Sequence, residues 1–329
     1  MKKILFVTSF RNLTISGQLQ EPFELLPGIN ITNNPRIKSK ILSRNLFRII
    51  GQIEYDHLTQ QESIVFCEFD EQELHELDTA QFLLVLLLWI KNLFRTAWIL
   101  KDHCMECDAA YLIKDWSQKD REYSNNFLAQ RTLLANGEIE PIMFSIEELN
   151  NWRDLNHKIE ERLHAENSGE FDFFMEKEYL RSARALHFIH SATTSRNLAF
   201  RIAHYCSALE TLFSTDAAEL SHKLSERTAF FLGSFGHDKA KVFKEIKAAY
   251  GVRSKLTHGD SINKKTIEQL PHISKTLDEY LRQIFAILYG ADWAVEHIDS
   301  APKKIDHIFA EMIFNGKTFI EAANEYQSS

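Results

Sequence analysis

The chain has 329 residues, of which 44% are hydrophobic, and its formal net charge is −8 at pH 7. Such a composition is too apolar for a disordered chain, and the length suffices for two packed domains. The acidic balance argues against a protein that coats nucleic acid by bulk electrostatic attraction. There are four cysteines, and the first residues lack the pattern of a secretory signal, so we expect reduced thiols and a cytoplasmic protein.

Residues 1–142 alternate short runs of β character with one strong helix. The helix is expected from about Gln72 to Phe94, and the β-like runs are ILFVTSF, ESIVFCEF, RTAWILKD and AAYLIKD. The most apolar segment, residues 82–90, is followed by Lys91 and has about half the length of a membrane span. We therefore predict a mixed α/β domain with a buried core helix and no membrane association.

Residues 143–329 have helical periodicity throughout. Ser145 followed by Glu148 predicts a capping box at the first helix of this part. Later helices are expected at about 173–192, 195–214, 217–233, 238–257, 264–289 and 303–325. The predicted fold class is α+β, with a mixed α/β domain at 1–142 followed by an all-helical domain at 143–329.

A Cys-x-x-Cys motif, Cys104 and Cys107, follows His103 in what reads as a hairpin loop. A structural zinc site normally needs four ligands, and the other cysteines, Cys67 and Cys206, stand alone in apolar surroundings. An incidental loop is favoured over a zinc site or a redox pair, so we expect no metal and no cofactor. Three phenylalanines are expected to seal a helix junction rather than to stack on bases: Phe171, Phe173 and Phe174.

Positive charge gathers in one region of this acidic chain. Between Ser221 and Lys265 there are ten Lys or Arg and four Asp or Glu, a local charge of +6 that leaves −14 elsewhere. The lysines fit either a solvated helix face or a patch that attracts phosphates. The candidates for contact with RNA are Lys244, Lys247, Lys255, Lys264 and Lys265.

Within this region, Arg253 and His258 stand near the expected end of a helix, in the segment YGVRSKLTHGD. Histidine moves protons near neutral pH, and a guanidinium holds phosphate and the negative charge that develops on it. Four residues separate Arg253 and His258, and this spacing alone is weak evidence for a site. Similar Arg-x5-His pairs also occur at Arg181 and His187 and at Arg184 and His190.

The helix that carries the pair has an apolar stripe formed by Val242, Phe243, Ile246, Ala249 and Tyr250. Arg253 falls on this stripe, so its charge needs a partner. Gly259 is expected to close the helix in the left-handed conformation. Residues i and i+5 do not share a helix face, so Arg253 and His258 would converge through the arginine's reach, a bend, or a dimer interface. The alternative is an arginine that satisfies a buried carboxylate and a histidine that caps the last carbonyls.

The chain resembles the HEPN superfamily, and more closely its Apea-like branch, at these residues. Tyr250, Arg253, Ser254, His258 and Gly259 match the family's Tyr-x-x-Arg-Ser-x-x-x-His-Gly-like pattern. SALETLF at 207–213 fits an earlier family helix and makes Glu210 its acidic residue, and LSERTAFFLG at 224–233 also belongs to the pattern. The resemblance is strongest over residues 195–290.

This resemblance implies an antiparallel helical bundle that forms a homodimer and acts as a metal-independent endoribonuclease. His258 would deprotonate a ribose 2′-OH and Arg253 would stabilise the charge at phosphorus, which leaves a 2′,3′-cyclic phosphate and a 5′-hydroxyl. Only RNA has the attacking hydroxyl. Tyr250 belongs to the supporting set, Ser254 and Thr257 could donate hydrogen bonds to phosphate, and Glu210 either orients the pair or is a structural ion-pair partner.

The resemblance also implies a setting in bacterial defence or a toxin system, with an antitoxin or another defence protein as a possible partner. A second function fits the same residues. A catalytically silent dimeric module would bind RNA or a protein, or act as a sensor, and Arg253 and His258 would then serve only the interface. The two hypotheses differ in whether His258→Ala removes cleavage or alters association.

Overall fold

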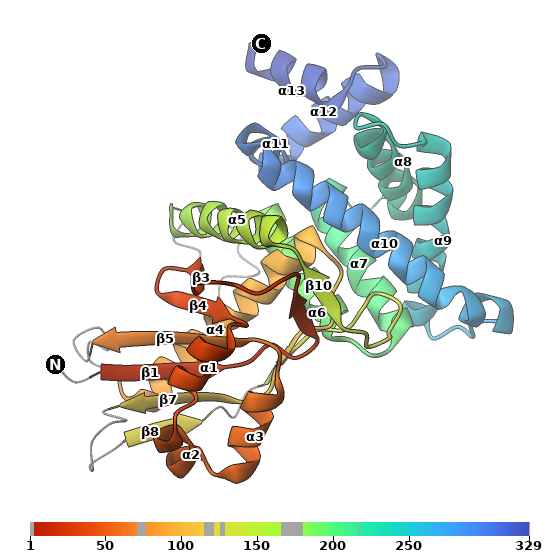
Figure 1. Cartoon of the computed structure of the whole chain (residues 1–329). Helices are drawn as coiled ribbons and strands as arrows, with labels where there is room; N and C mark the ends of the chain where they lie inside the picture. The colour runs from red at the N-terminus through yellow and green to blue at the C-terminus, as the bar shows by residue number, and fades with distance from the viewer. Residues whose placement is uncertain are drawn as a thin grey trace. The chain divides into compact units, whose positions relative to one another are not determined.

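The computed structural model describes residues 3–70, 77–114, 122–125, 129–165, 180–216 and 218–328. The chain divides into two compact units (Figure 1). Unit 1 comprises Met1–Thr132 and Ile139–Glu161, and unit 2 comprises Leu133–Glu138 and Arg162–Ser329. Among the described residues, all strands belong to unit 1 and unit 2 is built from helices, so the α+β class is confirmed.

Unit 1 contains a six-stranded sheet with the order β3-β4-β5-β1-β7-β8, in which all neighbours are antiparallel. Its strands are β1 (Lys3–Thr8), β3 (Phe23–Leu26), β4 (Ile29–Thr32), β5 (Ile64–Asp70), β7 (Ala110–Lys114) and β8 (Glu122–Asn125). Two small ladders pair β2 (Leu13–Ile15) with β10 (Ile142–Phe144) and β6 (Glu106–Cys107) with β9 (Gln130–Arg131). Three of the predicted β-like runs are confirmed as β1, β5 and β7.

Strand β1 lies at the centre of the unit because both of its faces are buried. Ile4 and Phe6 belong to one core cluster, which they share with α4 (Thr79–Leu100). Leu5 and Val7 belong to a second cluster, packed with the short helices α1 (Pro35–Ile41), α2 (Arg44–Ile50) and α3 (Gln52–Gln60). Successive side chains of a strand point to opposite faces, so helices on both faces require the continuous apolar run seen in the sequence.

Helix α4 begins later and ends later than expected. Asp78 and Gln81 form a capping box at its start, and the earlier residues 71–76 lie outside the described part. The run RTAWILKD was predicted as β-like, which is wrong, because α4 continues to Leu100. Neither Gly nor Pro interrupts this run, and Trp98 and Ile99 continue the buried face of the helix.

Helix α4 is also the one helix among the described residues that is long and apolar enough to cross a membrane by length and composition. Its most apolar 18-residue stretch is 56% buried within the protein. Phe82, Leu86, Ile90 and Leu93 all belong to the core cluster on one face of the sheet. This packing is that of a buried core helix, as the sequence predicted.

Helix α5 (Ile146–Ala165) begins with the predicted capping box. The Glu148 N–H lies 3.1 Å from Ser145 Oγ, and the Ser145 N–H donates to Glu148 Oε2 at 2.8 Å. Trp152 is fully buried, and its indole N–H donates to the Leu93 carbonyl of α4 at 3.0 Å. Most of α5 therefore packs within unit 1, although the predicted boundary placed all residues after 142 in the helical domain. Periodicity identifies a helix but not the partner against which it packs.

Unit 2 consists of α6 (Arg181–Thr194), α7 (Leu198–Phe213), α8 (Leu220–Gly233), α9 (Lys239–His258), α10 (Lys264–Gly290), α11 (Asp292–Ile298), α12 (Pro302–Phe314) and α13 (Phe319–Ser328). The helices predicted between 195 and 289 correspond to α7–α10. The single helix predicted at 303–325 is instead two, α12 and α13, separated at Gly316 with φ 67°. Helix α11 was not predicted. The predicted start at 173, with Phe171, Phe173 and Phe174, lies outside the described residues.

Helix α7 is the central element of unit 2, since α6, α8, α9 and α10 all pack against it. A polar bridge joins it to α10, where the Tyr205 hydroxyl donates to Asp278 Oδ1 at 2.7 Å and Arg282 pairs with Asp278 Oδ2 at 2.7 Å. Arg201, also on α7, is fully buried and donates to the carbonyl of Ser195 at 2.9 Å. Buried polar groups satisfied in this way specify how the helices meet.

Gly251 within α9 and Gly259 just after its end are expected to respond in opposite directions to alanine. Gly251 is exposed in the helix interior with open space around its Cα, so Gly251→Ala should raise the free energy of unfolding by about 0.5–1 kcal/mol. Gly259 has φ 75°, so Gly259→Ala should lower it by about 1 kcal/mol. Urea denaturation followed by circular dichroism measures both, and equal effects of the two substitutions would contradict the assigned helix end.

Candidate functional site

The packing of α7 against α9 brings a carboxylate to the motif arginine. Arg253 Nη2 lies 3.3 Å from Glu210 Oε1 and donates to Oε2 at 3.4 Å. The two side chains are only 25% and 19% exposed. Buried neighbours on α9, Ile246 and Ala249, confirm the predicted apolar stripe, and Glu210 is the partner that an arginine on this stripe needs.

The contact between Arg253 and Glu210 is longer than a well-formed ionic hydrogen bond, which measures about 2.7–2.9 Å. Glu210 Oε1 is buried and accepts no hydrogen bond from the described residues, so its contact with the guanidinium is Coulombic only. Arg253 thus keeps N–H groups without an acceptor among the described residues. The pair orients the guanidinium and leaves donors for a further anion.

Tyr250 restrains Arg253 from the preceding turn of the same helix. The guanidinium donates from Nη1 to the Tyr250 hydroxyl at 3.3 Å, and Cζ lies 5.2 Å from the centroid of the tyrosine ring. The tyrosine itself is 9% exposed and packs within the buried face of α9. Because Glu210 and Tyr250 approach from different helices, the arginine is held in one direction.

Burial favours the uncharged form of both partners of Arg253. It raises the pKa of Glu210, although the charge of Arg253 and a hydrogen bond from Tyr250 oppose this shift. Burial also raises the pKa of Tyr250, and the negative charge of Glu210 adds to that effect. For the pKa of Glu210, the effect of burial is therefore larger than the opposing effects of Arg253 and Tyr250.

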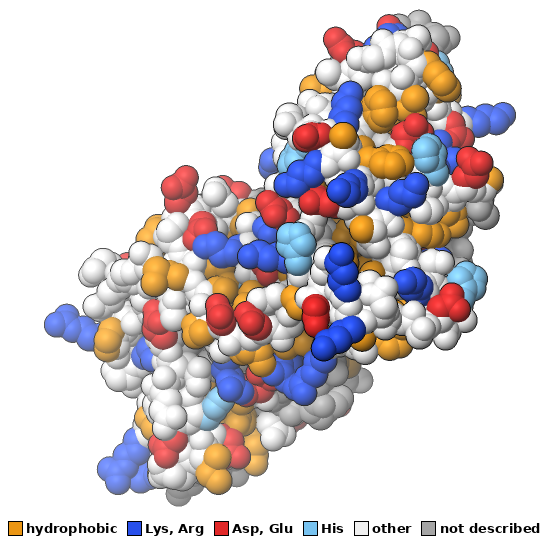
Figure 2. Space-filling model, turned by 90° about the vertical axis from the view of Figure 1, so that its right-hand side faces the viewer, with side chains coloured by type: hydrophobic (Ala, Val, Ile, Leu, Met, Phe, Trp, Pro, Cys, Tyr) orange, Lys and Arg blue, Asp and Glu red, His pale blue; other side chains and the backbone are white. Residues whose placement is uncertain are grey.

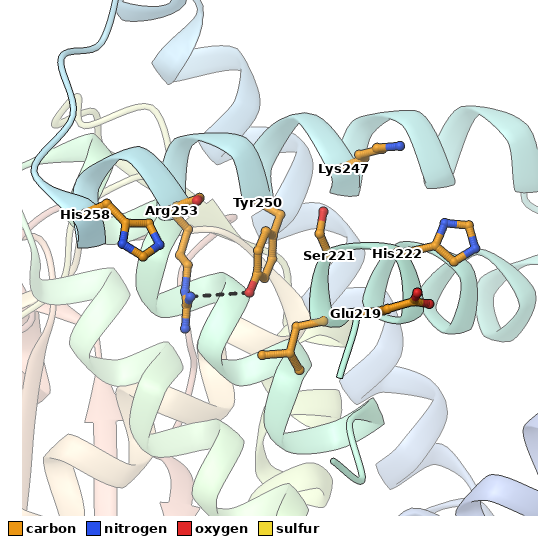
Figure 3. A pocket seen from close by; sticks show the side chains of 9 residues that line it. Glu219, Ser221, His222, Lys247, Tyr250, Arg253 and His258 are labelled. Atoms are coloured by element: carbon orange, nitrogen blue, oxygen red, sulfur yellow. Dashed lines mark hydrogen bonds between the residues drawn. The ribbon is translucent and has the colours of Figure 1, made fainter. Parts of the chain in front are cut away.

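Arg253 and His258 both line one open pocket of about 790 Å³. The remaining wall of α9 comes from Lys247, Tyr250 and Ser254, and the facing wall comes from the first turn of α8 and the residue before it: Glu219, Leu220, Ser221 and His222. Figure 3 shows the guanidinium and the imidazole extending from the same side of α9 near its end. One chain alone therefore brings the two motif residues to a common space.

His258 is the last residue of α9 and is exposed. Gly259 follows in the left-handed conformation with φ 75°, as predicted, and its N–H approaches the Leu256 carbonyl at 3.4 Å. The imidazole itself makes no hydrogen bond or ion pair with any residue that the structure describes. It does not cap the last carbonyls of the helix, which was the alternative role, and it is available to a ligand in the pocket.

The other candidates from the sequence divide between the pocket and its surroundings. Ser254 and Tyr250 lie in the wall, whereas the Thr257 hydroxyl donates to the Arg253 carbonyl at 2.9 Å and lies outside it. Of the five candidate lysines, Lys247 lines the pocket. The remaining four are not part of the described wall: Lys244, Lys255, Lys264 and Lys265.

Sequence reasoning missed the wall that α8 contributes. Glu219, at the N-cap of α8, has φ 49° and ψ 36°, a region that residues other than glycine uncommonly occupy. Three residues later, His222 lies with its ring centroid 5.4 Å from that of Phe243 on α9. The sequence predicted a helix here, but no local pattern indicates that its first turn faces α9.

The two Arg-x5-His pairs, Arg181 with His187 and Arg184 with His190, lie outside this pocket. Arg181 donates to the carbonyls of Thr211 at 3.0 Å and Ser214 at 2.7 Å and so binds the end of α7. Arg184, His187 and His190 are likewise not part of the described pocket wall. Arg253 and His258 differ from these two pairs in that both of their side chains line the pocket.

The Cys-x-x-Cys segment is buried and is not the hairpin loop that was expected. Cys104 donates to the Glu140 carbonyl at 3.0 Å, and Cys107 contacts the Thr8 hydroxyl at 3.1 Å. Burial raises the pKa of Cys104, and it raises that of Cys107 to about 12. No group of three His, Cys, Asp or Glu suited to a metal ion occurs within the described ranges. These cysteines are core residues of unit 1.

No family model, no curated protein and no solved structure matches the chain. The resemblance to HEPN proteins therefore rests on the motif residues alone.

The raised pKa of Glu210 predicts a pH dependence of stability. Because folding favours the neutral carboxyl, that contribution to stability is present below the ordinary glutamate pKa and is lost as pH rises through the raised one. Glu210→Gln removes this titration. The free energy of unfolding of the wild type minus that of the variant should therefore fall as pH rises above about 4, the ordinary range of a glutamate. Urea denaturation at each pH measures it, and a difference that rises with pH would show that Arg253 outweighs burial.

Proposed function

We propose that the pocket of unit 2 cleaves RNA without a metal ion, with His258 as general base and Arg253 as the group that stabilises the charge on the phosphate. The observation that carries the proposal is that both side chains line one open pocket, where the guanidinium is held by Glu210 and Tyr250 and the imidazole is unbonded. An oriented cation beside an available base is what this chemistry requires.

In the proposed reaction, His258 takes the proton of a ribose 2′-OH, and the resulting oxygen attacks the adjacent phosphorus. The bond to the 5′ oxygen of the next nucleotide breaks, and that oxygen takes up a proton. The products are a 2′,3′-cyclic phosphate and a 5′-hydroxyl. Negative charge gathers on the phosphate oxygens during the attack, and the free N–H groups of Arg253 are placed to receive it. Ser254, in the same wall, adds a hydroxyl donor.

We further propose that the protein belongs with the Apea-like HEPN proteins. The support is the set of motif residues together with the pairing of Glu210 with Arg253, since Glu210 stands at the acidic position of the family pattern. Membership would make the protein a cytoplasmic homodimer in a bacterial defence or toxin system, restrained by an antitoxin or a similar partner. The pocket described for one chain would then face its copy.

A specific observation favours a second function, a silent module that binds RNA or protein. Arg253 is three-quarters buried and already has a carboxylate partner, which is also how an arginine of purely structural role is arranged. In that case, Arg253 and His258 would support association of two chains without chemistry. This second function does not explain why His258 is exposed and makes no hydrogen bond with the described residues.

Cleavage of a labelled single-stranded RNA in excess chelator tests the first function. Arg253→Ala and His258→Ala should each lower the cleavage rate by about 10²–10⁴-fold, because each removes one group that acts only in the transition state. His272→Ala is the matched control, since this histidine is exposed on α10 and lies outside the pocket. Analysis of the ends should find cyclic phosphates.

Circular dichroism and sedimentation of each variant separate chemistry from structure. Unchanged fold and association with lost cleavage would support the nuclease. Cleavage by His258→Ala at the wild-type rate would contradict it, and altered association in that variant would favour the silent module.

A further inference from the structure

A second group of nitrogen-bearing side chains lies at the other end of the same pocket, away from the proposed cut. Lys247 of α9 and His222 of α8 line that end, and both approach Phe243. The Lys247 ammonium is 5.6 Å from the centroid of the Phe243 ring, and the His222 ring is 5.4 Å from it. The partly exposed ring of Phe243 thus lies against two nitrogen-bearing side chains that come from different helices.

This group is displaced along α9 from Arg253. Along α9, at about 1.5 Å per residue, Lys247 lies roughly 9 Å and Phe243 roughly 15 Å from Arg253. Successive phosphates of one strand in a duplex advance by about 3.4 Å, and an unstacked strand advances further. The distance along α9 between Arg253 and Lys247 therefore corresponds to a few nucleotides of a strand that continues past the cut.

The charges of the pocket favour such a strand. Arg253 and Lys247 are the basic side chains of the wall, and Glu219 is the carboxylate among the lining residues. His222 lies 3.9 Å from Glu226, one turn further along α8. Lys247 has no ion-pair partner among the residues that the structure describes. Cationic grooves with aromatic rings are the usual means of binding single strands without reading their sequence.

The charge of the rest of the molecule does not provide this attraction. The chain carries −8 overall, and on the face drawn in Figure 2 the Lys and Arg side chains are interspersed with Asp and Glu. A local groove is therefore needed to hold a polyanion at the site.

We propose that Lys247 and His222 form a binding subsite for a phosphate of single-stranded RNA, a few nucleotides from the bond that Arg253 and His258 cleave. Phe243 positions both side chains, and the Ser221 hydroxyl lies in the same wall. The subsite rests on the proposed function for its substrate, but its contact with the strand is a matter of binding and can be measured without cleavage. A strand too short to reach Lys247 would be a poor substrate.

Fluorescence anisotropy with a labelled single-stranded RNA of about 12 nucleotides tests the subsite. Lys247→Ala and His222→Ala should each weaken binding by about tenfold, and Lys247→Ala should reduce the slope of log affinity against log salt by about 1. Lys241→Ala, an exposed lysine of the same helix outside the pocket, is the matched control and should bind as the wild type does.

Cleavage kinetics supply the second readout. Lys247→Ala should lower kcat/KM for the long strand by about tenfold and leave a ribodinucleotide unaffected, because a dinucleotide does not reach the subsite. Weaker binding by Lys247→Ala with no cleavage by the wild type would support the subsite and reject the nuclease. Cleavage by the wild type with equal binding by Lys247→Ala and Lys241→Ala would overturn the subsite and leave the nuclease standing.

Discussion

An arginine on the apolar side of a helix is costly unless a carboxylate meets it, and in unit 2 Glu210 of α7 meets Arg253 of α9 at 3.3 Å. This contact constrains how the two helices pack, because α9 has to present Arg253 where α7 presents Glu210. It also directs the guanidinium toward the pocket that α8 completes. The site therefore depends on an ion pair that belongs to the core of the unit.

The pair is imperfect in a way that suits a ligand. Burial raises the pKa of Glu210, one of its oxygens accepts no hydrogen bond, and Arg253 retains donors beyond those used by Glu210 and Tyr250. An anion in the pocket would supply the missing acceptors and would sit beside His258, which has no partner in the described structure. A tightly closed bidentate pair would instead have satisfied the arginine and removed it from chemistry.

Sequence patterns correctly predicted those structural features that depend on residues close together in the chain. The apolar run of β1, the capping box of Ser145 and Glu148, the apolar stripe of α9 and the left-handed Gly259 all follow from neighbouring residues. The run RTAWILKD was misread because β-branched and aromatic residues also suit a buried helix when no breaker interrupts it. The short helices α1–α3 were missed because they are stabilised by packing on the sheet.

The site was predictable only in part for the same reason. Arg253, its need for a partner and the candidate Glu210 came from the helix face and the family pattern. The choice of Lys247 among five lysines, and the contribution of His222, depend on where the first turn of α8 meets α9. The contact between the first turn of α8 and α9 arises from tertiary packing, because residues 219–222 and 247–258 belong to helices that pack around α7. The spacing of these residues in the sequence does not predict this contact.

In the proposed reaction, His258 activates a ribose hydroxyl in a pocket where Arg253 holds the phosphate. The most direct measurement uses a DNA oligonucleotide with one ribose at a defined position, incubated with the protein in excess chelator and analysed by mass spectrometry. We expect one cut, on the 3′ side of the ribose, with a 2′,3′-cyclic phosphate end that is absent with His258→Ala. Cuts at deoxyribose positions, or ends that carry a 5′-phosphate, would contradict it.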